Sequence, residues 1–296
     1  MPYYRILVLK ILLLLVSVLI SWASCAENIS LTTQNIDAQQ SQKVASWLNT
    51  GVNVVESTLT PIPHAQLKIT VKGYPDAMEP VPWGQILREH PIEVLLYVNP
   101  NMPLSSFVND WTLYHELSHL YFPYLDYQNF WLSEGFATYM QYLVMFRGEI
   151  INSSQFVERI EQGLLRGKNK TQEKPGKLNE VSADMWQQRA FKRVYWSGAA
   201  YFMEADLQLI EKGKDLTEII ARFSHCCLRK TMSGGELVAT LDKLSKTSIF
   251  SALHRHYRYR VDFPDINQAQ LRVLAKHYQA KQGLSEQQQG SRIIAD

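Results

Sequence analysis

Cysteine is scarce in this sequence, which has three cysteines among 296 residues. Cys25 lies near the N-terminus, and Cys226 and Cys227 are adjacent, so a stapling disulfide framework is excluded. The adjacent pair also lacks the spacing of a zinc-thiolate site. We expect two thiols buried in a helix, with a regulatory disulfide between the neighbours as the alternative.

An excess of charge of either sign is also absent. The formal net charge of the whole chain is +2, from 30 Lys and Arg against 28 Asp and Glu. Residues 1–26 hold two cations and no acids, so the remainder has 30 − 2 = 28 cations and 28 acids, a net charge of zero. No global field then attracts the protein to nucleic acid, and no nucleic-acid partner is expected.

A hydrophobic run long enough to span a membrane is missing as well. The apolar run of residues 11–20 is shorter than the ~20 residues that a span requires. Arg5 and Lys10 precede it and small residues follow up to Ala26, which is the layout of a secretory signal peptide. We expect residues 1–26 to be a signal peptide and the protein to be exported, periplasmic or secreted. The alternative is an uncleaved N-terminal anchor, and only then is a membrane a partner.

The most informative feature that is present is an H-E-x-x-H motif at residues 115–119. Side chains at positions i and i+4 of a helix project from one face, so His115 and His119 can bind one metal ion. Glu116 lies close enough to accept a proton from a water molecule at that metal.

A candidate third ligand follows 14 residues after the second histidine. Residues 131–139 read W-L-S-E-G-F-A-T-Y and place Glu134 at the start of another helix. Two histidines and one glutamate match the three protein ligands of a catalytic zinc site, which leaves one position for water. The predicted cofactor is therefore Zn²⁺, which lowers the pKa of its water toward ~7. Glu116 is the predicted general base.

Periodicity and turn residues predict an α+β fold, with a small sheet before a mostly helical region. Strands are expected at residues 67–71, 81–86 and 92–98. Helices are expected at residues 37–59, 105–122, 131–146, 155–165, 193–211, 215–223, 237–244 and 248–257. An exposed loop at residues 166–180 and a frayed tail from Lys281 complete the prediction. The expected division is an α+β lobe of residues 27–125 with the active-site helix, and a helical lobe of residues 126–296 with the third zinc ligand.

The motifs resemble those of the gluzincin metallopeptidases, a group that includes the M1 and M61 aminopeptidases and smaller peptidase MA-like domains. In this group H-E-x-x-H is followed by a W-x-x-E-G type segment, as at residues 131–135. The resemblance implies a thermolysin-like zincin fold, in which a mixed sheet lies over the active-site helix. It also implies that Tyr195, in the Y-x-x-G segment of residues 195–198, stabilises the oxyanion.

The sequence departs from the M1 pattern at several positions. M1 enzymes have 18 residues between the second histidine and the glutamate, and their amine-binding G-x-M-E-N segment is absent here. Gln85 cannot supply the missing charge, so aminopeptidase activity does not follow from the resemblance. Thr138 stands where some zinc hydrolases have a carboxylate that supports a ligand, so such support must come from elsewhere.

The expected function is that of a zinc peptidase acting on a peptide or protein substrate. The alternative from another class is a catalytically silent, zinc-stabilised peptide-binding module of the cell envelope. Hydrolysis of a bond other than a peptide bond is a third hypothesis. Among the remaining histidines, His254 is expected at the surface, and His64 and His90 are expected in loops without a partner.

Overall fold

The computed structural model describes residues 29–293. The predicted signal peptide of residues 1–26 lies outside the described residues and stays a prediction. Within the described range, none of the helices combines the length and the apolar character that a membrane span needs.

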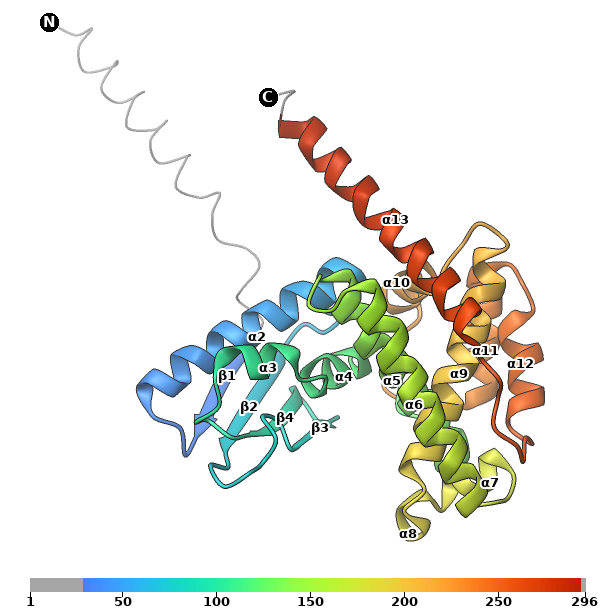
Figure 1. Ribbon diagram of the computed structural model, residues 1–296, viewed down its shortest axis with the longest axis horizontal. Helices are drawn as coiled ribbons and strands as arrows, with labels where there is room; N and C mark the ends of the chain where they lie inside the picture. The colour runs from blue at the N-terminus through green and yellow to red at the C-terminus, as the bar shows by residue number, and fades with distance from the viewer. Residues whose placement is uncertain (1–28, 294–296) are drawn as a thin grey trace, which may run out of the picture.

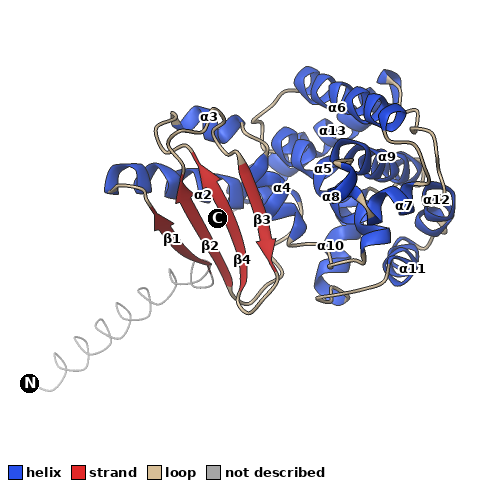
Figure 2. Cartoon of the chain, turned by 90° about the horizontal axis from the view of Figure 1, so that it is seen from below, coloured by secondary structure: helices blue, strands red, loops and turns tan. Residues whose placement is uncertain are grey.

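The first lobe is built on a four-stranded mixed sheet with the strand order β1-β2-β4-β3. Its strands are β1 (Ile29–Gln34), β2 (Leu67–Gly73), β3 (Trp83–Leu87) and β4 (Ile92–Val98). The first three in the sheet order are parallel, and β3 pairs with β4 in the antiparallel direction at one edge. Figure 2 shows these strands side by side, with the helical lobe beyond β3. Three strands match the prediction, whereas β1 was missed because its residues alternate weakly and are mostly exposed.

Helix α2 (Ala38–Thr58) packs against the helices that follow the sheet. The predicted helix of residues 105–122 is two helices, α3 (Leu104–Asn109) and α4 (Thr112–His119). Asp110 has extended backbone angles between them, and its carboxylate accepts a hydrogen bond from the Thr112 backbone N–H at 2.8 Å. An aspartate that bonds the backbone two residues on interrupts one helix and starts the next. The break makes α4 a short, wholly buried helix.

The carbonyl groups at the C-terminal end of α4 are bonded by side chains from the first lobe. The Arg88 guanidinium donates to the carbonyl oxygens of His119 at 3.1 Å and Phe122 at 3.0 Å. The Nε2 atom of His64 lies 2.8 Å from the carbonyl oxygen of Leu120. The expectation that His64 has no partner was therefore wrong. These contacts satisfy carbonyls that a helix end leaves unpaired and fix the direction of α4.

The second lobe is helical, as predicted. After a short 3₁₀ turn (Tyr127–Asn129) come α5 (Phe130–Arg147), α6 (Ser153–Glu173), α7 (Leu178–Ala183), α8 (Met185–Gln188), α9 (Phe191–Ile210), α10 (Leu216–Cys226), α11 (Gly234–Ser245), α12 (Ile249–Tyr257) and α13 (Gln268–Ile293). Helix α5 is buried on all sides from residue 131 to residue 146, as a central helix must be. The α+β class and the order of a small sheet before helices are confirmed. The lobe boundary near residue 125 stays a prediction.

The predicted loop at residues 166–180 was wrong over its first half, because α6 continues to Glu173. The two glycines of α6, Gly163 and Gly167, allow another helix to pack closely and do not break α6. A Cβ atom on Gly163 would lie 1.9 Å from the ring of Trp196, and one on Gly167 would lie 2.5 Å from the Cβ atom of Trp196. The two glycines let α6 approach α9 closely.

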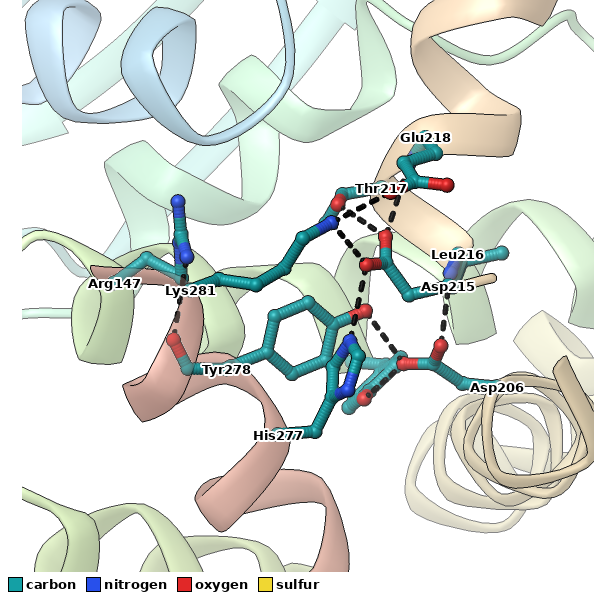
Figure 3. Close-up of polar contacts among 10 residues, drawn as sticks. Arg147, Asp206, Asp215, Leu216, Thr217, Glu218, His277, Tyr278 and Lys281 are labelled. Atoms are coloured by element: carbon teal, nitrogen blue, oxygen red, sulfur yellow. Dashed lines mark hydrogen bonds and ion pairs between the residues drawn. The ribbon is translucent and has the colours of Figure 1, made fainter. Parts of the chain in front are cut away.

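Helix α13 (Figure 1) continues past Lys281, the residue from which a frayed tail was predicted, and the fraying itself stays a prediction. A buried polar network holds α13 to the lobe (Figure 3). The Asp206 carboxylate accepts hydrogen bonds from the hydroxyls of Tyr139 at 2.7 Å and Tyr278 at 2.8 Å. Asp215 accepts from His277 at 3.0 Å and forms an ion pair with Lys281.

Two further expectations are corrected. Cys226 and Cys227 form a disulfide at the end of α10, and Cys226 is exposed, so the two are not buried thiols. His254 is buried against Trp131, with ring centroids 5.8 Å apart, and its Nε2 atom lies 3.0 Å from Oδ1 of Asn129. The short amphipathic pattern of α12 does not reveal that the His254 side chain points into the core.

Candidate metal centre

Helices α4 and α5 bring the three predicted ligands together. The Nε2 atoms of His115 and His119 are 3.2 Å apart. One Glu134 carboxylate oxygen lies 3.3 Å from Nε2 of His115, and the other lies 3.7 Å from Nε2 of His119. All three side chains are buried, and their ligand atoms lie within 4.8 Å of one another.

These separations fit a tetrahedral metal centre. Zinc–nitrogen and zinc–oxygen bonds of about 2.0–2.2 Å give a tetrahedron whose edges are roughly 3.4 Å long. The Nε2–Nε2 separation of 3.2 Å and the separation of 3.3 Å between His115 Nε2 and the nearer Glu134 oxygen lie close to that length. Two imidazole nitrogens that face each other across such a distance are best satisfied by sharing one cation. The donor set therefore fits a divalent metal ion.

Gln141 supports the first histidine, a role that the sequence analysis missed. Its Oε1 atom lies 2.8 Å from Nδ1 of His115, so Nδ1 donates and Nε2 keeps its lone pair for a metal. Gln141 stands seven residues after Glu134 and therefore two turns along the same face of α5. That spacing was the available signal. The hydroxyl of Thr138, the position considered instead, has no hydrogen-bond partner in the described part of the chain.

Glu134 is held as a carboxylate. Burial alone raises the pKa of a carboxyl group, but the imidazoles of His119 and His115 outweigh it and hold the pKa of Glu134 well below its usual range. A deprotonated carboxylate and two neutral imidazoles leave a divalent ion with a net positive charge, which suits a catalytic site.

Glu116 follows His115 directly in α4 and is buried beside the ligands. Burial, helped by the neighbouring Glu134 carboxylate, raises the pKa of Glu116 to about 7, although His115 opposes the shift. The backbone of β3 approaches it closely at Gly84. A Cβ atom at Gly84 would lie 2.7 Å from Cγ of Glu116, so any side chain there displaces the carboxylate. Glycine at this position leaves room for Glu116.

Tyr195 reaches the site from α9. Its ring stacks on that of His115, with centroids 5.9 Å apart and an angle of 16°. Burial and the Glu134 charge raise the pKa of Tyr195 well above its usual value, so the hydroxyl keeps its proton and remains a donor. The structure thus brings all five predicted site residues to one place.

A glycine contact explains why the two motifs in α5 and α9 each contain glycine. A Cβ atom on Gly135 would lie 2.3 Å from Cα of Gly198, and one on Gly198 would lie 1.9 Å from the carbonyl oxygen of Trp131. The helix backbones touch at this crossing. Because Glu134 precedes one glycine and Tyr195 stands three residues before the other, the crossing sets their separation.

The site opens into a cleft of about 640 Å³ between the two lobes. The wall from the first lobe includes β3 and the turn between α3 and α4, and the opposite wall includes α8 and the start of α9. His115, Glu116, His119, Glu134 and Tyr195 all line the cleft. A substrate can therefore reach every predicted site residue from solvent.

The fold is that of the gluzincin metallopeptidases, a small mixed sheet followed by a helical lobe with the ligands on two neighbouring helices. Residues 120–207 match the M61 glycyl aminopeptidase family. That segment contains Glu134 and Tyr195 and begins immediately after the second histidine. No curated protein matches the chain.

Several solved structures share this fold. An M1 zinc metallopeptidase from Deinococcus radiodurans is 16% identical, with a TM-score of 0.54 over 82% of this chain and 51% of that one. A mutant of a D. radiodurans M1 enzyme bound to a Tyr-Ser-Ala substrate is 17% identical, with a TM-score of 0.51 over 78% and 48%. Leukotriene A4 hydrolase from Saccharomyces cerevisiae is 14% identical, with a TM-score of 0.58 over 83% and 40%. The chain spans about half the length of these proteins or less.

Proposed function

We propose that this protein is an exported, zinc-dependent peptidase that hydrolyses peptide bonds. One observation carries the proposal. The buried ligand set of His115, His119 and Glu134 lies beside the free carboxyl group of Glu116 at the floor of an open cleft. The M61 family match over residues 120–207 supports the choice of peptide bonds.

The chain's own groups supply the acid, the base and the oxyanion donor. Zinc bound by the three ligands would polarise the scissile carbonyl and make water more acidic. Glu116 takes a proton from the attacking water and later delivers it to the leaving amine. The protonated Tyr195 hydroxyl donates a hydrogen bond to the developing oxyanion.

The silent binding module accounts less well for Glu116. A metal that only stabilises the fold is usually enclosed by four protein ligands, whereas this site offers three and opens to a cleft. A buried carboxyl group beside another carboxylate also destabilises the fold. Its presence next to the ligands supports catalysis.

The position of cleavage within the substrate is a separate part of the proposal. Gln85 lies in β3 at the edge of the cleft, and its neutral amide cannot supply the charge that would pair with a free amine. We therefore propose cleavage that does not depend on a free N-terminus of the substrate.

Export of the protein is proposed from the N-terminal segment of residues 1–26, and the Cys226–Cys227 disulfide fits an oxidising compartment. Retention of the N-terminal segment as an anchor is the alternative.

The test is a peptide-library cleavage profile with metal analysis of the same sample. We expect about one zinc ion per chain, cleavage that a chelator abolishes and zinc restores, and equal rates on free and N-acetylated peptides. Full zinc occupancy without cleavage of any peptide would favour the binding module. Cleavage confined to free N-termini would identify an aminopeptidase.

A further inference from the structure

The tryptophans fall into two groups, one in the core and one on a single surface. Among the six that the structure describes, Trp47, Trp131 and Trp196 are buried. The other three are 45%, 42% and 55% exposed, and all three line the cleft of the metal centre. These exposed residues are Trp83, Trp111 and Trp186. An exposed apolar surface gathered at one cleft indicates a binding site for an apolar group.

A continuous series of aromatic rings crosses the cleft from one wall to the other. Trp186 contacts Phe191 with centroids 4.8 Å apart, and Phe191 contacts Tyr195 at 6.4 Å. Tyr195 stacks on His115, which contacts Trp111 at 5.5 Å. The series runs from α8, past the ligands, to the turn between α3 and α4. Each ring is held by its neighbour, so this apolar surface is formed before any substrate binds.

The edge strand β3 also borders the cleft. Trp83 packs edge-on against Tyr97 of β4, with centroids 5.4 Å apart, and this contact holds the indole in place. Gly84 follows directly and lies against Glu116. Because side chains alternate along a strand, the Trp83 indole points to the other face of β3 from Gly84, and it borders the cleft at the edge of the sheet.

We propose that the cleft selects peptides with bulky apolar side chains, aromatic or leucine-like, next to the scissile bond, and that Trp83 and Trp186 determine this specificity. The inference rests on the proposed peptidase function and adds the substrate class. Burial of a large side chain between preformed aromatic surfaces releases water from both partners, whereas an alanine at the same position leaves the indoles exposed.

The first experiment compares matched N-acetylated peptides that differ only at the residues flanking one bond, with Phe and Leu in one and Ala in the other. We expect kcat/KM to favour the Phe-Leu peptide roughly tenfold or more, mainly through a lower KM. W83A and W186A should each reduce this preference severalfold. Tyr74 is equally exposed at 53% but does not line the cleft, so Y74A is the matched control and should keep the preference. Equal kcat/KM for both peptides, or an unchanged preference in both variants, contradicts the proposal.

The second experiment separates binding from hydrolysis. Zinc-loaded E116Q protein is titrated with the same two peptides while the fluorescence of its tryptophans is followed. We expect the Phe-Leu peptide to bind more tightly, with a signal change that W186A reduces. Equal affinity for both peptides overturns the specificity inference even if the wild-type protein hydrolyses peptides. Preferential binding without hydrolysis by the wild-type protein overturns the proposed function and leaves the inference on specificity standing.

Discussion

At the scale of one residue, Glu116 shows that a buried group placed for catalysis can destabilise the fold. Its carboxyl group is buried, and its pKa is raised from 4.5 to about 7. The ionised form is therefore disfavoured in the folded protein. Without metal, this group lowers the stability of the fold as the pH rises from its unfolded pKa near 4.5 through 7. Below that window the carboxyl group is protonated in both states and has no such effect.

E116Q should therefore stabilise the metal-free protein at pH 8 by about 3 kcal/mol, because the pKa of Glu116 is near 4.5 in the unfolded chain and about 7 in the fold, and it should leave the protein nearly unchanged at pH 4. Urea unfolding of chelator-treated protein at the two pH values measures the difference. Glu211 is exposed, so E211Q is the control and should show little difference at either pH. A gain from E116Q that is equal at pH 4 and pH 8 contradicts the assignment.

Gln141 gives a second prediction at this scale. Q141L removes the acceptor for Nδ1–H of His115, so zinc affinity should fall roughly tenfold to a hundredfold. The control is T138V, one turn away on α5, because the Thr138 hydroxyl has no partner among the described residues. Competition with a chromophoric chelator measures both affinities. Equal zinc affinity in Q141L and the wild-type protein would show that Gln141 does not orient the ligand.

The two histidines could be predicted from the sequence as a metal-binding pair, because their spacing alone determines their relative positions on a helix. H-E-x-x-H places His115 and His119 on one helical face whatever the rest of the chain does. Glu134 was predicted from the number and type of ligands that a catalytic zinc site needs, whereas Tyr195 required the resemblance to known peptidases, since only the tertiary fold brings α9 to the site. The Gln141 contact and the inward turn of His254 depend on which helix packs where, and no local pattern encodes that.

At the scale of elements, the crossing of α5 and α9 is the contact on which the site depends. G135A should force the two backbones apart, because its Cβ atom would lie 2.2 Å from the carbonyl carbon of Gly198. We expect a loss of about 2–3 kcal/mol in the free energy of unfolding. Peptide hydrolysis should also fall, because Glu134 and Tyr195 move relative to each other.

The matched control for G135A is G235A. Gly235 lies in the first turn of α11 with no neighbouring atom within 4 Å of an added Cβ, so G235A should be neutral or stabilise by about 0.5–1 kcal/mol. Denaturant unfolding and peptide cleavage are measured on both variants. If G135A and G235A have the same stability and the same activity, the close crossing does not control the site.

The errors in the predicted elements share a physical cause. Gly167 and its polar neighbours suggested a loop because glycine disfavours helices, yet α6 keeps this glycine because Trp196 leaves no room for a side chain. The break between α3 and α4 follows from one hydrogen bond of Asp110. Tertiary packing and single side-chain bonds outweigh propensity at these positions.

For the whole molecule, Asp206 ties α9 to α5, α10 and α13 (Figure 3). D206A should leave the Tyr139 and Tyr278 hydroxyls and the Leu216 N–H without their acceptor. The expected loss is about 3 kcal/mol or more in the free energy of unfolding. Glu218, a partly exposed partner of Lys281, is the control, and E218A should cost less than about 1 kcal/mol. Equal losses in the two variants, measured by urea unfolding, would show that Asp206 does not hold the helical lobe together.

The central claim is that Glu116 acts on water at a zinc ion held by His115, His119 and Glu134. The most direct measurement is the rate of peptide cleavage by purified wild-type and E116Q proteins with equal, verified zinc content. The proposed mechanism predicts that E116Q binds zinc and folds as the wild-type protein does and loses nearly all hydrolysis, at least a hundredfold. Cleavage by zinc-loaded E116Q at the wild-type rate would contradict it.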